Sequence, residues 1–132
     1  MPNEKTLIRT EYREMNHLDY LLILYIRQLR EERGWTQQEL SERMGVTKSF
    51  VGNVESFTQR HKYSIRHLTL IAKAFEYNSI SKLFDFPTPE HDKIRLILKV
   101  TTVLKENEKS RSKSVEVVKI VEGGAKVKSN KF

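Results

Sequence analysis

Apolar residues recur at helical spacing along the first two thirds of the chain, and polar stop signals separate the runs. The first run covers residues 17–33 and ends at Gly34. The second follows Thr36 and Glu39, which have the spacing of a capping box, and ends at Gly45. The pattern therefore predicts two short, well-delimited helices in this part of the chain.

Residues 37–56 are predicted to form the second helix, a tight turn and a third helix. Thr47 has the hydroxyl needed to cap the third helix, and Val51 and Val54 point back toward its neighbours. The polar residues of helix 48–56 then share its outward face: Lys48, Ser49, Gly52 and Asn53. A small, hydrogen-bonding outer face suits contact with base edges in the major groove of DNA.

Two further helices are predicted before the pattern changes. Ser64 caps a helix that runs from residue 65 to about residue 77, and Ser79 starts a short fifth helix. The prolines at 87 and 89 end the helical region because proline cannot continue a helix.

Beyond residue 93 the apolar pattern alternates. Five of the six even positions from 94 to 104 are apolar, against two of the seven odd positions from 93 to 105. Alternation and β-branching favour a strand, with a helix as the alternative. Residues 114–122 are also rich in valine and isoleucine, so the two segments predict an antiparallel hairpin. A lone hairpin is marginal in water, so it needs either the helical domain or a second copy as a partner.

The fold class is therefore mainly α, and the chain divides into four parts. The predicted parts are an N-terminal arm at 1–16, a five-helix domain at 17–88, a β-hairpin appendage for dimerisation at 89–122 and a disordered basic tail at 123–132. The arm is either a short amphipathic piece or a flexible segment.

The segment from about Leu21 to Phe86, about half the chain, resembles the phage repressor and Cro class of helix-turn-helix proteins, often called Xre-type. The resemblance is carried by Leu29 and Arg30, Thr36 to Leu40, Met44 to Val46, Ser49, Val51, Asn53 to Glu55, and Leu68 to Phe75. Ser41 departs from the alanine that is usual there, although it is still small. The resemblance implies a repressor-like domain that binds DNA.

The resemblance also implies roles for particular side chains. Gln37 matches a glutamine that contacts a DNA phosphate beside the amides of a helix N-terminus. Arg30 and Glu55 match a pair that orients the first helix against the recognition helix. The other expected phosphate contacts are Thr47, Arg60, His61 and Lys62. The plainer alternatives are that Gln37 is solvated, that residues 60–62 belong to a soluble loop, and that Arg30 and Glu55 are two unrelated surface charges.

Composition narrows the function further. Residues 1–90 carry 13 Lys+Arg against 12 Asp+Glu, whereas residues 91–132 carry 11 against 5. The excess positive charge, which favours a polyanionic partner, therefore lies outside the helical domain. Without cysteine, neither a disulfide nor a cysteine metal cage is possible, and the histidines lack ligand spacing. With no nucleophile–base pair or glycine-rich phosphate loop, we expect neither an enzyme nor a bound cofactor or metal.

These observations favour a sequence-specific DNA-binding transcriptional regulator, a homodimer on a two-fold operator that reads double-stranded DNA with helix 48–56. The alternative is an antitoxin-like interaction module that neutralises a partner protein, a role that does not exclude DNA binding. The first helix has surplus apolar residues that form either a wide core stripe or a partner surface: Leu21, Ile23 and Leu24. No signal peptide or membrane-spanning run is evident, so a bacterial or phage-encoded protein of the cytoplasm is expected.

Overall fold

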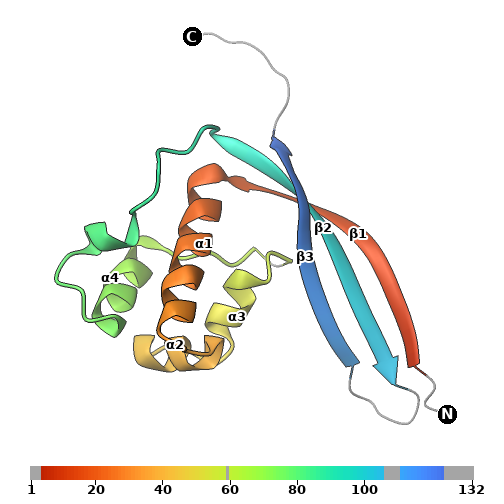
Figure 1. The fold of residues 1–132 in the computed structure, drawn as a ribbon, viewed down its shortest axis with the longest axis horizontal. Helices are drawn as coiled ribbons and strands as arrows, with labels where there is room; N and C mark the ends of the chain where they lie inside the picture. Colours follow the sequence, from red (N-terminus) through yellow and green to blue (C-terminus); the bar gives the residue numbers. More distant parts are fainter. Residues whose placement is uncertain (1–3, 59, 106–110, 124–132) are drawn as a thin grey trace, which may run out of the picture. The chain divides into compact units, whose positions relative to one another are not determined.

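The computed structural model describes residues 4–58, 60–105 and 111–123 (Figure 1). The chain forms two compact units. The helical unit is Asn16–Asp92, and the sheet unit combines Met1–Met15 with Lys93–Phe132. The helical unit is therefore inserted between two strands of the sheet unit. The tail that we predicted to be disordered falls, from residue 124 onward, outside the described residues.

The helical unit contains four α-helices among its described residues, where five helices were predicted. They are α1 (His17–Glu32), α2 (Gln37–Met44), α3 (Phe50–Glu55) and α4 (Ile65–Ala74). The expected fifth helix is a 3-10 helix, η1 (Ile80–Leu83). This element stays short because the chain reaches Pro87 within one further turn and cannot continue as a helix.

Every element of the helical unit contributes to one apolar core. Its innermost side chains are each less than 2% exposed: Ile23, Ile26, Leu40, Val51, Val54, Ile71, Phe75 and Leu83. α2 packs against α3 and α4, and α1 packs against α3 and η1. Of the surplus apolar residues in α1, Ile23 belongs to this core, whereas Leu21 and Leu24 are half-buried.

Local sequence signals fix the ends of α2. The Thr36 hydroxyl accepts from the Glu39 backbone N–H at 3.0 Å, and the Glu39 carboxylate accepts from the Thr36 N–H at 3.2 Å. Gly45 ends the helix in the left-handed conformation, with φ +77°, where a side chain would be strained. The capping box and the glycine stop therefore lie where the sequence predicts them.

The two ends of the helical unit are held together. The His17 N–H donates to the Asp92 carbonyl at 2.9 Å, and the His91 N–H donates to His17 Nδ1 at 3.0 Å. The two imidazole rings stack with their centroids 5.5 Å apart. The chain therefore enters and leaves the helical unit at one place.

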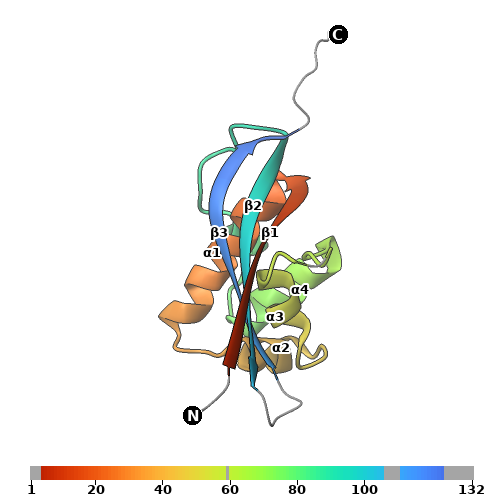
Figure 2. The ribbon, with the colours of Figure 1, turned by 90° about the vertical axis from the view of Figure 1, so that its right-hand side faces the viewer.

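The sheet unit is a three-stranded antiparallel sheet rather than the predicted hairpin. Its strands are β1 (Glu4–Asn16), β2 (Lys93–Lys105) and β3 (Arg111–Glu122), in the order β1-β2-β3 (Figures 1 and 2). The β2–β3 hairpin is present as predicted. The N-terminal arm, however, is a strand that pairs with β2, because β2 in the centre of the sheet offers it a complete ladder of backbone groups.

The alternation predicted for β2 is confirmed, and the helical alternative was wrong. Even-numbered side chains from Ile94 to Val100 are at most 1% exposed, whereas Lys93, Arg95 and Lys99 are exposed. The β2–β3 register shifts by one residue between Ile97 and Leu98, so β3 carries a bulge.

Candidate nucleic-acid interface

The turn between α2 and α3 presents an exposed polar segment. Thr47, Lys48 and Ser49 are all exposed, and α3 begins at Phe50 rather than at residue 48. The predicted Thr47 cap was wrong: Ser49 is the N-cap residue of α3, and it makes no side-chain capping bond. The Thr47 carbonyl instead accepts from the Phe50 N–H at 3.0 Å. Lys48 and Ser49 therefore lie just before the helix instead of on its outer face.

A side chain from α2 replaces the missing cap. The buried Ser41 hydroxyl accepts from the Val51 backbone N–H at 3.0 Å and donates to the Gln37 carbonyl at 3.0 Å. This hydroxyl satisfies an amide in the first turn of α3, which has no intrahelical partner. From the sequence, Ser41 was expected only to be a small residue in place of the usual alanine. The departure from alanine at this position was the signal of its hydrogen-bonding role.

A buried ion pair joins α1 to α3. Arg30 Nε donates to Glu55 Oε2 at 3.0 Å and Nη2 donates to Glu55 Oε1 at 2.9 Å, so the contact is bidentate. The two side chains are 9% and 2% exposed. Arg30 Nη1 also donates to the Trp35 carbonyl at 2.6 Å, which fixes the chain just before α2. This one arginine therefore ties together the end of α1, the start of α2 and the end of α3.

Gln37 extends the same network. Its amide nitrogen donates to Glu55 Oε1 at 2.9 Å, so the Gln37 side chain is held by the buried ion pair. The carboxylate of Glu55 has acceptor capacity beyond the two Arg30 bonds, and Gln37 uses it. Gln37 also lies across Gly52, where an added Cβ would come 3.0 Å from Gln37 Oε1. Gly52 therefore makes room for the Gln37 side chain.

The outward residues of α3 and the following loop lie on the surface. Asn53 is half-buried, and the loop residues Arg60, His61 and Lys62 are exposed. Lys62 Nζ lies 3.6 Å from a carboxylate oxygen of Asp19 in the first turn of α1. An exposed pair of this kind is worth little in stability, so Lys62 can exchange it for another anion.

The predicted phosphate-contacting residues thus occupy two places. Gln37 is linked through Glu55 to Arg30 in the last turn of α1, whereas Lys62 is linked to Asp19 in the first turn. Arg30 follows Asp19 by eleven positions in α1, which corresponds to about 16 Å along the helix axis.

Two titratable side chains pack beneath the loop and α3. The hydroxyl of Tyr63 is buried without a hydrogen-bond partner among the described residues, and burial, with a smaller effect of Glu55, raises its pKa. His67 Nδ1 accepts from the Ser64 N–H at 2.9 Å in the α4 capping box, and its ring lies 4.5 Å from that of Phe50. Partial burial, and then the nearby Arg66, lower the pKa of His67.

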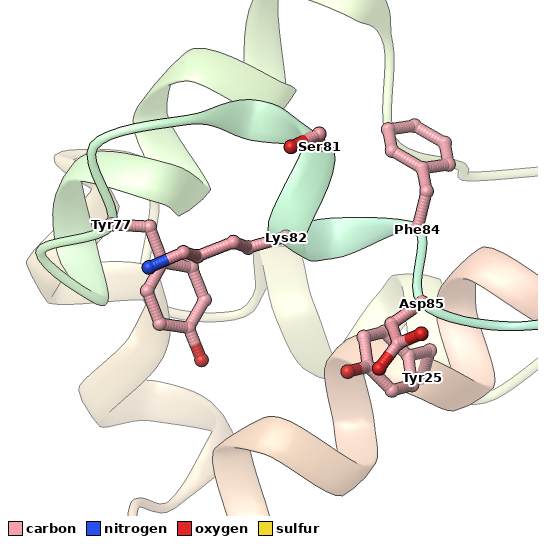
Figure 3. Close-up of a pocket in the computed structure, with 6 residues that line it drawn as sticks. All are labelled: Tyr25, Tyr77, Ser81, Lys82, Phe84 and Asp85. Atoms are coloured by element: carbon pink, nitrogen blue, oxygen red, sulfur yellow. The ribbon is translucent and has the colours of Figure 1, made fainter.

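A separate open pocket of about 430 Å³ lies elsewhere in the helical unit (Figure 3). Its lining residues are Tyr25, Tyr77, Ser81, Lys82, Phe84 and Asp85. The Lys82 ammonium lies 5.7 Å from the centroid of the Tyr77 ring, so the cation in the pocket is already engaged. The described residues contain no cluster of three His, Cys, Asp or Glu able to hold a metal ion. None of their helices is long and apolar enough to cross a membrane.

Known proteins resemble the helical unit. Residues 26–83 match a family model described as helix-turn-helix. A competence pilus inhibition repressor of Acinetobacter baylyi is 39% identical over 59 residues, which are 45% of this chain and 51% of that protein. The chain therefore spans about half the length of this curated relative.

Two solved structures of SinR also match. One, of the master regulator for biofilm formation SinR in complex with DNA, is 31% identical and covers 48% of this chain and 98% of that one, with a TM-score of 0.41. The other, the N-terminal DNA-binding domain of SinR from Bacillus subtilis, is 30% identical and covers 51% and 94%, with a TM-score of 0.42.

Proposed function

We propose that this chain, which belongs to the helix-turn-helix family through residues 26–83, is a sequence-specific DNA-binding transcriptional regulator. The observation that carries the proposal is an exposed polar turn that leads into α3 and is held in place by buried hydrogen bonds. Ser41 fixes the first turn of α3, and the bidentate Arg30–Glu55 pair fixes its last residue. Both ends of the short helix are therefore held rigidly, as recognition of base edges requires.

The proposed base-reading residues are Lys48, Ser49 and Asn53. Lys48 and Ser49 are exposed just before α3, so they extend from the helix end that enters the groove. Lysine donates to the acceptors of guanine, and asparagine can form two hydrogen bonds with adenine. Gly52 lies between Ser49 and Asn53 and has no side chain, so the backbone can approach the bases there.

The proposed phosphate contacts flank this segment. Gln37 lies near one end of α1, and the loop that carries Arg60, His61 and Lys62 lies near the other. Thr47 adds an exposed hydroxyl in the turn. Such contacts supply affinity and register without sequence information. In the proposed complex, these residues contact the DNA backbone on either side of the major groove that α3 enters.

A single helix-turn-helix unit reads few base pairs, so we also propose a homodimer on a two-fold site. Two recognition helices about 34 Å apart would then occupy successive major grooves on one side of the duplex. The names of two similar proteins agree with a DNA-binding regulator: one is called a repressor, and another is described in complex with DNA.

Selection of bound sequences from a random duplex pool tests the proposal, with Asn53→Ala as the decisive variant. We expect wild-type protein to enrich one two-fold motif, and Asn53→Ala to lose about 1–3 kcal/mol on that motif and to accept any base at one position per half-site. Asn78→Ala, which changes an exposed asparagine beyond α4, is the matched control. An equal loss on every sequence, or no enriched motif, would refute the proposed reading.

A further inference from the structure

Among the described residues of the single chain, no strand pairs with the outer edge of β1. This strand has 13 residues, and β2 lies on one side of it only (Figure 1). Its outer edge therefore presents a row of N–H and C=O groups that can pair with another strand. Three of its apolar side chains are more than half exposed: Leu7 at 53%, Ile8 at 60% and Tyr12 at 66%.

The opposite edge of the sheet is less suited to pairing. β3 carries the bulge at the register shift, and a bulge twists an edge away from a partner strand. Neither β1 nor β3 contains proline or glycine, so the bulge is the feature that distinguishes the two edges. Of the two edges, β1 is therefore the one that a second strand can extend.

The sequence of β1 is complementary to itself in one antiparallel arrangement. In a two-fold antiparallel pair, one residue faces its own copy and its neighbours face each other in order. With Thr10 at the centre, Arg9 faces Glu11 of the other copy and Ile8 faces Tyr12, and each of these contacts occurs twice. Thr10 is also the midpoint of Glu4–Asn16, so this register pairs the strand over its full length.

Neighbouring registers are worse. Centring the pair on Arg9 or on Glu11 places that charge opposite its own copy, which is destabilising. Centring it on Ile8 or on Tyr12 avoids the like charges but leaves four residues at one end of each strand without a partner. The charge pattern and the length of β1 together therefore favour the register centred on Thr10.

The two sides of the strand would carry different contacts. Glu14 Oε2 lies 3.1 Å from Arg95 Nη2, so even positions of β1 share a face of the sheet with odd positions of β2. Ile8 and Tyr12 therefore meet their counterparts on that face. Within one chain, Arg9 Nε lies 2.6 Å from Glu11 Oε2. In the pair, Arg9 and Glu11 of one copy face Glu11 and Arg9 of the other on the opposite face of the sheet.

We propose that two copies of this chain associate by antiparallel pairing of β1 with β1, with Thr10 on the two-fold axis, to form one continuous six-stranded sheet. The inference rests on the proposed function in that it names the surface of the dimer that a two-fold operator requires. The partner is a second copy because the strand complements its own charge and apolar pattern.

Cysteine cross-linking tests the register directly, because the chain has no cysteine of its own. In Thr10→Cys the two sulfur-bearing residues face each other with Cα atoms about 4.5–5.5 Å apart, within disulfide range. Thr6→Cys is the matched control: it is an exposed threonine on the same face of the strand, but the two copies of position 6 lie about 26 Å apart. We expect a disulfide-linked dimer with Thr10→Cys and none with Thr6→Cys.

Cross-linking at Ile8→Cys or Tyr12→Cys in place of Thr10→Cys would show a different register and overturn the proposal, as would equal cross-linking of the Thr6 control. Charge reversal provides an independent reading. Arg9→Glu and Glu11→Arg should each weaken dimerisation roughly tenfold in sedimentation equilibrium, and the double exchange should restore it. An unchanged association constant in both single variants would remove β1 from the dimer interface.

The outcome can be separated from that of the proposed function. A protein that selects one DNA motif but does not cross-link at Thr10 is a DNA-binding regulator with another dimer surface, so only the edge pairing is overturned. A Thr10-linked dimer that selects no motif supports the edge pairing and refutes the DNA-binding function.

Discussion

Replacing Arg30 with methionine isolates the energetic role of the buried ion pair. The change removes both bonds to Glu55 and the bond to the Trp35 carbonyl, while it keeps an apolar stem of similar length. The Glu55 carboxylate, 2% exposed, then keeps Gln37 as its remaining hydrogen-bond partner in the network. Breaking a buried pair in this way costs about 3–5 kcal/mol because a charge is left uncompensated. For a unit of this size, that corresponds to a fall in Tm of at least about 12 °C.

The double variant Arg30→Met with Glu55→Leu separates the pair energy from the burial cost. Removing both charges should leave the protein more stable than either single variant, because no uncompensated charge remains. Thermal and urea unfolding of the four proteins gives the coupling energy. Arg27→Met is the control, since Arg27 forms an exposed pair with Glu31 in the same helix and should change stability by no more than about 0.5 kcal/mol. Additive losses in the double variant would refute the reasoning.

Three further substitutions test the same region. Ser41→Ala leaves the Val51 N–H buried without an acceptor and should cost about 1–3 kcal/mol in urea unfolding; a loss below about 0.5 kcal/mol would contradict the capping role. Since the pKa of His67 is lowered from 6.5 in the folded state, its contribution to stability is present above about pH 6.5 and lost as the pH falls. His67→Gln should therefore reduce the drop in Tm between pH 7.5 and pH 5.5. An identical drop in the variant would exclude His67 as a source of the pH dependence. Gly52→Ala should leave the Tm within about 3 °C, because the gain in helix propensity offsets the displacement of Gln37. It should nevertheless weaken binding to the selected DNA in a titration, and unchanged affinity would remove both Gly52 and Gln37 from the interface.

The sequence predicts those parts of the helical unit that depend on neighbours a few residues away. The Thr36–Glu39 capping box, the stop at Gly45 and the cap at Ser64 all involve partners within one helical turn. The predicted start of α3 was wrong because the Val51 N–H in its first turn is satisfied by Ser41, which lies ten residues earlier and on another helix. A local cap such as Thr47 cannot be distinguished from a tertiary one without knowing how the two helices pack.

The sheet unit shows the same limit over a longer distance. β2 was identifiable because one of its faces is buried, which imposes a strict alternation on the sequence. β1 lacks that signal, since residues 5–10 are all exposed and polar side chains occur at both even and odd positions. Its pairing with β2 is a contact across 81 residues, as the Glu14–Arg95 bond illustrates. No local pattern in residues 1–16 indicates which strand they join.

The distribution of charge predicts that dimerisation and DNA binding respond differently to salt. The helical unit carries 10 Lys+Arg and 10 Asp+Glu, whereas the sheet unit carries 14 against 7 and so holds the whole net charge of +7. Two sheet units joined at β1 would repel each other, and added salt would screen that repulsion and strengthen the dimer. Binding of a polyanion would respond in the opposite sense, because salt reverses the gain from counterion release. Two-fold association and DNA affinity, measured over one range of salt, should therefore change in opposite directions. DNA that neutralises the sheet units would also remove the repulsion that opposes pairing of β1, which couples operator binding to dimer formation.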